Sequence, residues 1–222
     1  VTRAIFGIDR ITSGTIELNG RPYAPKSAKD AMSHAVALVP EDRREQGLVV
    51  SHSVRDNLTL TRLNECRSSG LLSTRKIEKI ASDLIRRFSI KVDDQAAPAS
   101  QLSGGNQQKI VIAKWLGREP DLLIMDEPTA GVDIGTKSEV LANVTEFANS
   151  GKGVLFISSE LAEMIAVCDR YVVMKRGEVV AELSSEGIDT EADLQLAIQH
   201  AGMTVDEGRT IQDGEVLEGK ES

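Results

Sequence analysis

Residues 101–133 read QLSGGNQQKIVIAKWLGREPDLLIMDEPTAGVD, and this stretch decides the fold. It joins a small-residue turn at Ser103–Gly105, a segment with apolar residues at helical spacing, and the aliphatic run Leu122–Met125, which ends in Asp126 and Glu127. A run that is apolar on both faces is typical of a central strand in a parallel sheet covered by helices. Because α/β folds bind ligands at the carboxyl ends of such strands, we expect a ligand site there.

The turn and the strand end each suit phosphate chemistry. A helix N-terminus presents unpaired N–H groups and a partial positive charge, so it attracts phosphate. Ser103 can cap that helix and face an anion, while Gly104 and Gly105 let the backbone approach a ligand closely. Asp126 can hold a Mg²⁺ shell, and Glu127 can orient or polarise an attacking water. The alternative is an ordinary loop and a solvated strand end.

In this order and this close together, the three parts resemble the signature motif, the Walker B motif and the D-loop of an ABC-type ATPase. The resemblance implies an α/β fold like that of P-loop NTPases, with a mainly parallel sheet, a small antiparallel β part and a helical subdomain. It also implies ATP and Mg²⁺ as ligands. The residues it places in the site are Ser103, Gly104, Gly105, Gln107 and Asp133 for nucleotide, Asp126 and Glu41 for metal, and Glu127 and Ser159 for catalysis.

Composition limits the classes of function. The chain has 222 residues, 41% of them hydrophobic, and a net charge of −8, which argues against a nucleic-acid partner held by bulk electrostatics. Cys66 and Cys168 form no disulfide framework and fit a reducing cytoplasm. No apolar run approaches membrane-spanning length and no signal peptide opens the chain, so we expect a soluble protein that reaches the membrane through a partner.

The N-terminal part predicts a helix and a short strand. Val1–Gly7 reads as the middle of a helix, and the alternating Thr15–Leu18 lies between two turns. In the family, the phosphate loop (Walker A) precedes that helix, and it is missing from this sequence. Gly131–Ser138 looks like such a loop, but Thr136 spoils the spacing and Asp133 would repel phosphate, so we interpret it as a D-loop followed by a helix.

Ala35–Val39 predicts a second buried strand, which ends in the charged loop Pro40–Arg44. In the family, the matching strand leads into the Q-loop, whose glutamine contacts Mg²⁺ and the water. This chain has Glu41 there. A carboxylate still binds a metal but adds a negative charge beside the phosphates. The alternative is a solvated charged loop.

Residues 51–118 predict a helical subdomain that ends in the signature helix. Its clearest signal is an amphipathic stripe, which we expect to pack in the core, at Ile77, Ile80, Ala81, Leu84, Ile85 and Phe88. The resemblance implies that this subdomain and the Glu41 loop meet a transmembrane partner. We therefore divide the chain into core residues 1–50, the subdomain 51–118, core residues 119–200 and a disordered, acidic tail 201–222.

The C-terminal part predicts alternating helices and strands. After the D-loop we expect a helix that buries Val140, Leu141, Val144 and Phe147, then a doubly buried strand at Val154–Ile157. The family places a histidine in the switch loop that follows, where this chain has Ser159, which reaches less far and does not titrate. A hairpin at residues 171–183 and a helix near Ala192–His200 complete the prediction. The three histidines, His34, His52 and His200, have no ligand-type neighbours at metal spacing.

The signature LSGGNQQK, the loop EDRREQGL and the switch SSE together resemble the second ATPase cassette of bacterial monosaccharide importers of the ribose, galactose, xylose and arabinose type. The resemblance implies a peripheral ATPase on the cytoplasmic face of the cell membrane that couples ATP hydrolysis to sugar uptake. Its partners are a second cassette in a head-to-tail dimer, permease subunits and, indirectly, a sugar-binding protein, with no nucleic acid. Alternatives are a degenerate regulatory cassette and an importer of a nucleoside or autoinducer. A protein that acts on DNA or ribosomes is a further alternative, and the acidic balance and the absence of basic patches in this sequence argue against it.

Overall fold

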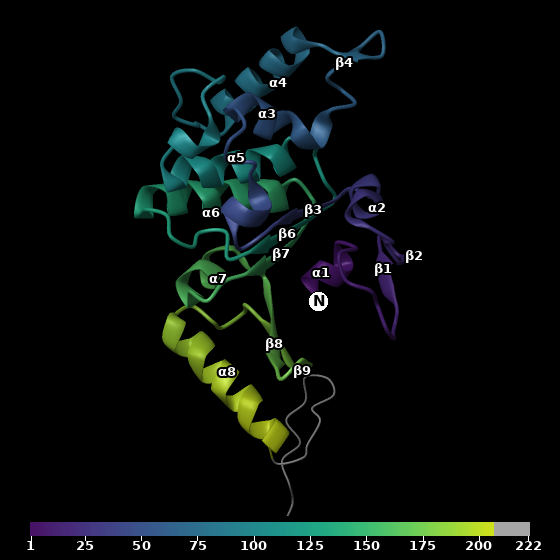
Figure 1. Cartoon of the computed structure of the whole chain (residues 1–222). Helices are drawn as coiled ribbons and strands as arrows, with labels where there is room; N and C mark the ends of the chain where they lie inside the picture. The colour runs from purple at the N-terminus through teal and green to yellow at the C-terminus, as the bar shows by residue number, and fades with distance from the viewer. Residues whose placement is uncertain (207–222) are drawn as a thin grey trace, which may run out of the picture. The chain divides into compact units, whose positions relative to one another are not determined.

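The computed structural model of the chain describes residues 1–206, with side chains described as far as residue 201 (Figure 1). Packing divides the chain into two compact units, Val1–Ser158 and a second that begins at Ser159. Each unit is considered by itself below. The first holds the parallel sheet and the helical subdomain, and the second holds a hairpin with two helices.

The parallel sheet of the first unit has the order β3-β6-β7, with β6 in the middle. The side chains of Leu123, Ile124 and Met125 on β6 have no exposed surface, which confirms the predicted central strand. The prediction that β7 is buried on both faces was wrong. Only Phe156 is buried there, and the other residues of the strand are exposed or half-buried. The strands are β3 (Val36–Val39), β6 (Leu122–Asp126) and β7 (Gly153–Ile157).

Residues 51–118 are largely helical, as predicted, and their helices pack on α5. In the amphipathic stripe Ala81, Leu84 and Phe88 are buried, and its three isoleucines are half-buried. The sequence did not predict the hairpin β4–β5, whose turn has positive φ at Ser69 and Gly70. The elements are α3 (Val54–Thr59), η2 (Leu60–Arg62), β4 (Arg67–Ser68), β5 (Leu71–Leu72), α4 (Thr74–Arg87), η3 (Ala99–Gln101) and α5 (Gly104–Leu116).

Helix α5 lies over the sheet together with α6 (Ile134–Asn149), and α5 is buried over nearly its whole length (Figure 1). On α6 the predicted Val140 and Val144 are buried, whereas Leu141 and Phe147 are only half-buried. The N-terminal helix α1 (Thr2–Ile5) leads to Phe6, whose ring meets that of Trp115 edge to face with centroids 5.6 Å apart. This contact anchors the start of the chain on α5.

The remaining elements of the first unit are short. An antiparallel pair, β1 (Ile16–Leu18) and β2 (Arg21–Tyr23), turns at Asn19-Gly20, where both residues have positive φ as a tight hairpin requires. This pair is the small antiparallel part that was predicted. Helix α2 (Ala28–Ser33) precedes β3, and the turn η1 (Arg43–Gly47) follows it.

The second unit is built around the hairpin of β8 (Arg170–Lys175) and β9 (Glu178–Ser184), which the sequence predicted. Helix α7 (Leu161–Val167) precedes it, and α8 (Glu191–Asp206) packs on both strands and on α7. Residues 201–206, predicted to belong to a disordered tail, are helical; the rest of that predicted tail lies outside the described residues. In the described part of the chain, no helix has both the length and the apolar character needed to cross a membrane.

Candidate functional site

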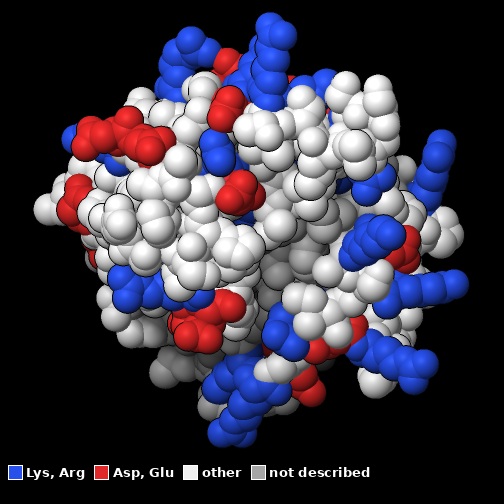
Figure 2. Space-filling model, turned by 45° about the horizontal axis from the view of Figure 1, so that its top comes forward, with Lys and Arg blue, Asp and Glu red and all other residues white. Residues whose placement is uncertain are grey.

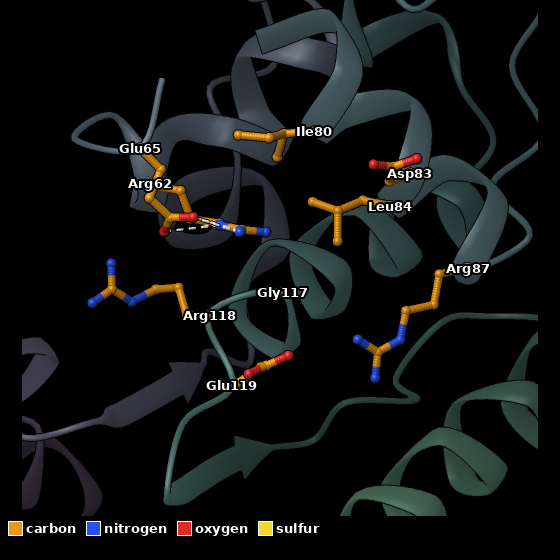
Figure 3. Close-up of a pocket in the computed structure, with 9 residues that line it drawn as sticks. All are labelled: Arg62, Glu65, Ile80, Asp83, Leu84, Arg87, Gly117, Arg118 and Glu119. Atoms are coloured by element: carbon orange, nitrogen blue, oxygen red, sulfur yellow. Dashed lines mark hydrogen bonds and ion pairs between the residues drawn. The ribbon is translucent and has the colours of Figure 1, made fainter. Parts of the chain in front are cut away.

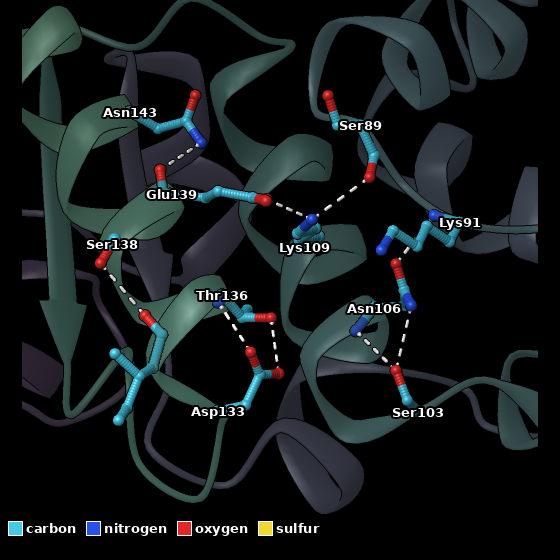
Figure 4. Close-up of polar contacts among 11 residues, drawn as sticks. Ser89, Lys91, Ser103, Asn106, Lys109, Asp133, Thr136, Ser138, Glu139 and Asn143 are labelled. Carbon is cyan, nitrogen blue, oxygen red and sulfur yellow. Dashed lines mark hydrogen bonds and ion pairs between the residues drawn. The ribbon is translucent and has the colours of Figure 1, made fainter.

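The signature turn, Leu102–Gly105, presents Ser103 at the N-terminus of the 13-residue helix α5. Ser103 is the N-cap, and its Oγ accepts a hydrogen bond from the backbone N–H of Asn106 at 3.4 Å (Figure 4). A second bond to the same oxygen comes from the side-chain Nδ2 of Asn106 at 3.0 Å. Ser103 is exposed, so its hydroxyl lies at the surface, where an anion can reach it.

The two glycines after Ser103, Gly104 and Gly105, are required by close contacts within the chain. A Cβ on Gly105 would lie 2.6 Å from Thr136 Oγ1 on α6, and a Cβ on Gly104 would lie 2.8 Å from Nη2 of Arg43. Both distances are shorter than real Cβ contacts, so any side chain would displace a neighbour. The glycines therefore let α5 approach α6 and the η1 turn, and their approach to a ligand stays a prediction.

The structure does not support the predicted contact of Gln107 with nucleotide. Its side chain is fully buried, and Nε2 donates to the carbonyl oxygens of Ala99 and Leu102, both at 3.1 Å. Its Oε1 accepts from Nε of Arg44 at 3.3 Å. Gln107 is thus a structural residue, which ties the signature turn to the chain on either side of it.

Asp133 of the D-loop is the N-cap of α6. Its Oδ1 accepts from the backbone N–H of Thr136 at 3.0 Å, and its Oδ2 accepts from the Thr136 hydroxyl at 2.8 Å (Figure 4). These bonds, led by the one from the backbone N–H, lower the pKa of the exposed Asp133 carboxyl. The carboxylate is therefore ionised and held in place, and it sits above Gly105, with Oδ2 3.2 Å from the position of a Cβ there.

Asp126 and Glu127 lie at the carboxyl end of β6, as predicted. Glu127 has φ +44°, a left-handed conformation that side chains rarely adopt, and its N–H donates to the Ile157 carbonyl at 2.9 Å. Strained backbone of this kind is common at functional sites. Glu41 is exposed, two residues beyond the end of β3, which pairs in parallel with β6. The Asp126 and Glu41 carboxylates therefore follow neighbouring strand ends at one edge of the sheet.

Carboxylate oxygens are the donors that Mg²⁺ prefers, so Asp126 and Glu41 fit the predicted metal in chemistry. Over the described residues, no group of three or more His, Cys, Asp and Glu side chains is placed to hold a metal ion. Two carboxylates would need further oxygen ligands, which a nucleotide's phosphates provide in phosphoryl-transfer sites. Ser159 is exposed and opens the second unit, and its catalytic role stays a prediction.

Sequence reasoning missed Arg43, which joins three segments of the site. Its Nη1 donates to the carbonyl of Ala130 at 2.9 Å and its Nη2 to that of Gly131 at 3.5 Å, while the guanidinium covers Gly104. Asp42 supports this position by capping η1, since its Oδ1 accepts from the backbone N–H of Arg44 at 2.9 Å. The only signal for Arg43 in the sequence was its place in a charged loop.

Lys109, also missed, ties α5 to α6 from a buried position. Its Nζ forms an ion pair with Glu139 and donates to the Ser89 carbonyl at 3.2 Å (Figure 4). The helical subdomain also contains a cavity of about 370 Å³ with many charged residues in its wall (Figure 3). Arg62 there pairs with Glu65, and Arg118 bonds the Met32 carbonyl, so these charges serve internal contacts away from the signature turn.

Comparison with known proteins identifies the class. The ABC transporter family matches residues 1–130, more than half of the chain, and the chain belongs to this family. Two solved structures share the fold: the dimeric ATP-binding cassette MJ0796 bound to ADP and Pi, and cbiO1 from Clostridium perfringens, part of the ABC transporter complex cbiONQ. The first has a TM-score of 0.69 at 20% identity over 83% of this chain and 79% of that chain. The second has a TM-score of 0.68 at 25% identity over 92% of this chain and 81% of that chain.

Among curated proteins, the chain is similar to sugar importer subunits. It is 41% identical to a putative ribose/galactose/methyl galactoside import ATP-binding protein of Rhizobium meliloti (strain 1021), over 93% of this chain and 41% of that protein. It is 40% identical to the ribose import ATP-binding protein RbsA of Shouchella clausii (strain KSM-K16), over 89% of this chain and 40% of that protein. The chain thus spans about two fifths of the length of these relatives.

Proposed function

We propose that this chain is an ATPase cassette of a bacterial monosaccharide importer, in which it donates its signature turn to a composite ATP site. One observation carries the proposal: an exposed serine caps the N-terminus of a long buried helix, whose Gly105 lies against Asp133 and Thr136. The names of the relatives supply the solute class, a pentose or hexose. The signature motif does not determine which sugar is transported.

The chain's residues have separate tasks in this proposal. The Ser103 hydroxyl and the first N–H groups of α5 bind the phosphates of a nucleotide held mainly by a second cassette. Asp126 and Glu41 would hold Mg²⁺ at the cassette's own site, where the ion would supply neutralisation of phosphate charge, and Glu127 would orient the attacking water. Glu41 and Ser159 replace the glutamine and histidine that the resemblance leads one to expect, so the two composite sites are unequal and the one built on this cassette is slower.

The permease is proposed to dock on the helical subdomain. A groove of about 180 Å³ lies there, with Leu60, Leu63 and Leu72 in its wall and Asp56 and His52 at its polar side. The three leucines are each more than a third exposed, which is unusual for clustered aliphatic side chains unless a partner covers them. An apolar helix end of the permease fits this surface, and the cassette would then sit on the cytoplasmic face of the membrane.

The overall charge supports a protein partner rather than a nucleic acid. Basic and acidic side chains are interspersed over the face in Figure 2, and the net charge is −8. A protein that binds phosphate backbones by bulk electrostatics needs the opposite sign.

The test is the substitution Ser103→Ala in the complete transporter that contains this cassette. We expect the ATPase rate to fall by at least about tenfold, because a hydrogen bond to a charged group is lost in the site. The matched control is Ser73→Ala, since Ser73 caps α4 through Lys76 N–H at 3.4 Å, the distance found for Ser103 and Asn106. It removes an equal cap far from the signature turn. Full activity of Ser103→Ala would refute signature donation.

A second candidate, a cassette that only regulates its partner, is favoured by Glu41 and Ser159 at the two sensor positions. The variant Glu127→Gln separates the two. If this cassette hydrolyses ATP, the substitution slows turnover at its own site and leaves nucleotide binding intact. A regulatory cassette would show the same ATPase rate with glutamate or glutamine at position 127.

A further inference from the structure

Asn106 holds Ser103 by an arrangement of hydrogen bonds that sets the direction of the serine proton. Asn106 lies in the first turn of α5. Its Oδ1 accepts from the backbone N–H of Lys91 at 2.8 Å, and its Nδ2 donates to Ser103 Oγ at 3.0 Å (Figure 4). The backbone N–H of Asn106 donates to the same oxygen at 3.4 Å.

The Lys91 contact fixes which way the Asn106 amide faces. Oxygen and nitrogen of an amide are assigned from their partners, and a backbone N–H only donates. The atom facing Lys91 N is therefore the oxygen, and the NH₂ group must face Ser103. The bond to Lys91 thus sets the polarity of the bond to Ser103.

This polarity leaves one hydrogen-bonding group of Ser103 unused, the hydroxyl proton. A hydroxyl has two acceptor lone pairs and one donor proton, and both bonds to Ser103 Oγ occupy its lone pairs. Among residues 1–201, whose side chains are described, the Ser103 hydroxyl donates no hydrogen bond, and the residue is exposed. Its proton is therefore directed away from Asn106 and is available to an acceptor that arrives from solvent.

We propose that Asn106 is a positioning residue that presents the Ser103 hydroxyl as a hydrogen-bond donor to a phosphoryl oxygen. The inference rests on the proposed function, because it concerns the same signature turn. Without the Asn106 amide, the hydroxyl could rotate and turn a lone pair toward the phosphate, which repels it. The chain orders the donor before nucleotide arrives, so binding pays less entropy for it.

The test is Asn106→Asp in the complete transporter, because aspartate has nearly the same shape as asparagine. One carboxylate oxygen keeps the bond from Lys91 N–H, while the other accepts from the Ser103 hydroxyl and turns its proton inward. We expect kcat/KM for ATP hydrolysis to fall by at least about tenfold, as for a lost charge-assisted hydrogen bond. Asn143→Asp, on the outer part of α6, adds the same charge away from the turn and should leave kcat/KM within about twofold.

A double-mutant cycle separates the polarity from the new charge and from structural damage. Once Ser103→Ala has removed the hydroxyl, Asn106→Asp should change kcat/KM by less than about threefold. An equal loss in both backgrounds, or no loss in the Ser103 background, would overturn the role of Asn106. If Ser103→Ala alone leaves hydrolysis intact, the signature-donation proposal fails instead, and the two failures are told apart by that single variant.

Discussion

Gly105 decides how closely α5 and α6 approach each other. The space that a side chain would need is filled by the Thr136 hydroxyl, which itself bonds Asp133. We predict that Gly105→Ala lowers the free energy of unfolding by about 1–3 kcal/mol, the usual cost of overpacking a tight contact. Urea denaturation of the chain measures this directly.

The control for this prediction is Gly153→Ala in β7. A Cβ at Gly153 would meet Leu122 Cδ1 at 3.4 Å and the Asp121 carbonyl at 3.6 Å, which are ordinary contacts. Its stability should change by less than about 1 kcal/mol. An equal loss for both variants would mean that the α5–α6 contact is not what requires glycine at 105.

At the residue scale, the sequence predicted caps better than side-chain partners. The predicted cap Ser103 occupies its position because a cap depends on residues within one turn, which a local pattern contains. Gln107 was placed in the nucleotide site, yet its amide is buried with Ala99, Leu102 and Arg44. The position of Arg44, 63 residues away in the chain, follows from the packing of η1 on α5 and from no local pattern.

At the element scale, η1 is held to the D-loop by Arg43. We predict that Arg43→Ala speeds hydrogen exchange of the Ala130 and Val132 amides by about tenfold, since losing bonds worth about 1–1.5 kcal/mol makes local opening easier. Both amides are bonded inside the D-loop, to the Glu127 and Thr129 carbonyls, so they report its opening. Exchange measured by mass spectrometry or NMR gives the rates.

Arg86→Ala is the matched control for Arg43→Ala. Arg86 lies on the outer face of α4 with a side chain that is 78% exposed and pairs with Asp83. Exposed pairs of this kind contribute little, so D-loop exchange should not change. Unchanged exchange in Arg43→Ala as well would show that the D-loop holds its shape without the guanidinium.

Strands β6 and β7 show how far a sequence pattern predicts the burial of an element. Both are short aliphatic runs, and both were predicted to be buried on two faces. Only β6 is, whereas β7 buries Phe156 alone. Which helices and loops cover each face of a strand depends on the whole fold. The hairpin β4–β5 escaped prediction because its strands have two residues each, too short for any periodic signal.

At the scale of the whole molecule, the sequence grouped residues 119–200 as one part of the ATPase core. Packing divides them after Ser158, since α7, the β8–β9 hairpin and α8 make their contacts with one another. The division made from the sequence follows the order of motifs in the family. The compact units follow the density of contacts, so a motif such as the switch at Ser159 can fall at the boundary between them. The helical subdomain was predicted because its stripe from Ile77 to Phe88 is long enough to show a period. The parallel sheet was predicted from short aliphatic runs without a period and from the family resemblance.

The proposed permease surface gives the last prediction, which concerns assembly. Leu60 is 44% exposed in the wall of the apolar groove on the helical subdomain. We predict that Leu60→Asp reduces the amount of cassette that copurifies with the permease by about tenfold, because a charge at a desolvated contact costs more than 1.4 kcal/mol. The isolated chain should keep its circular dichroism spectrum, since an exposed leucine contributes little to the core.

Leu196→Asp is the control that decides what the loss means. Leu196 is 53% exposed on α8 and does not line the groove, so the substitution introduces the same charge at a similar exposure on another element. If only Leu60→Asp releases the permease, the groove is the contact. If both variants copurify normally, the permease binds elsewhere, and the exposed leucines belong to a different surface. If neither variant copurifies with the permease, the added charge destabilises the cassette as a whole. Urea denaturation of the two variants would then show equal losses in the free energy of unfolding.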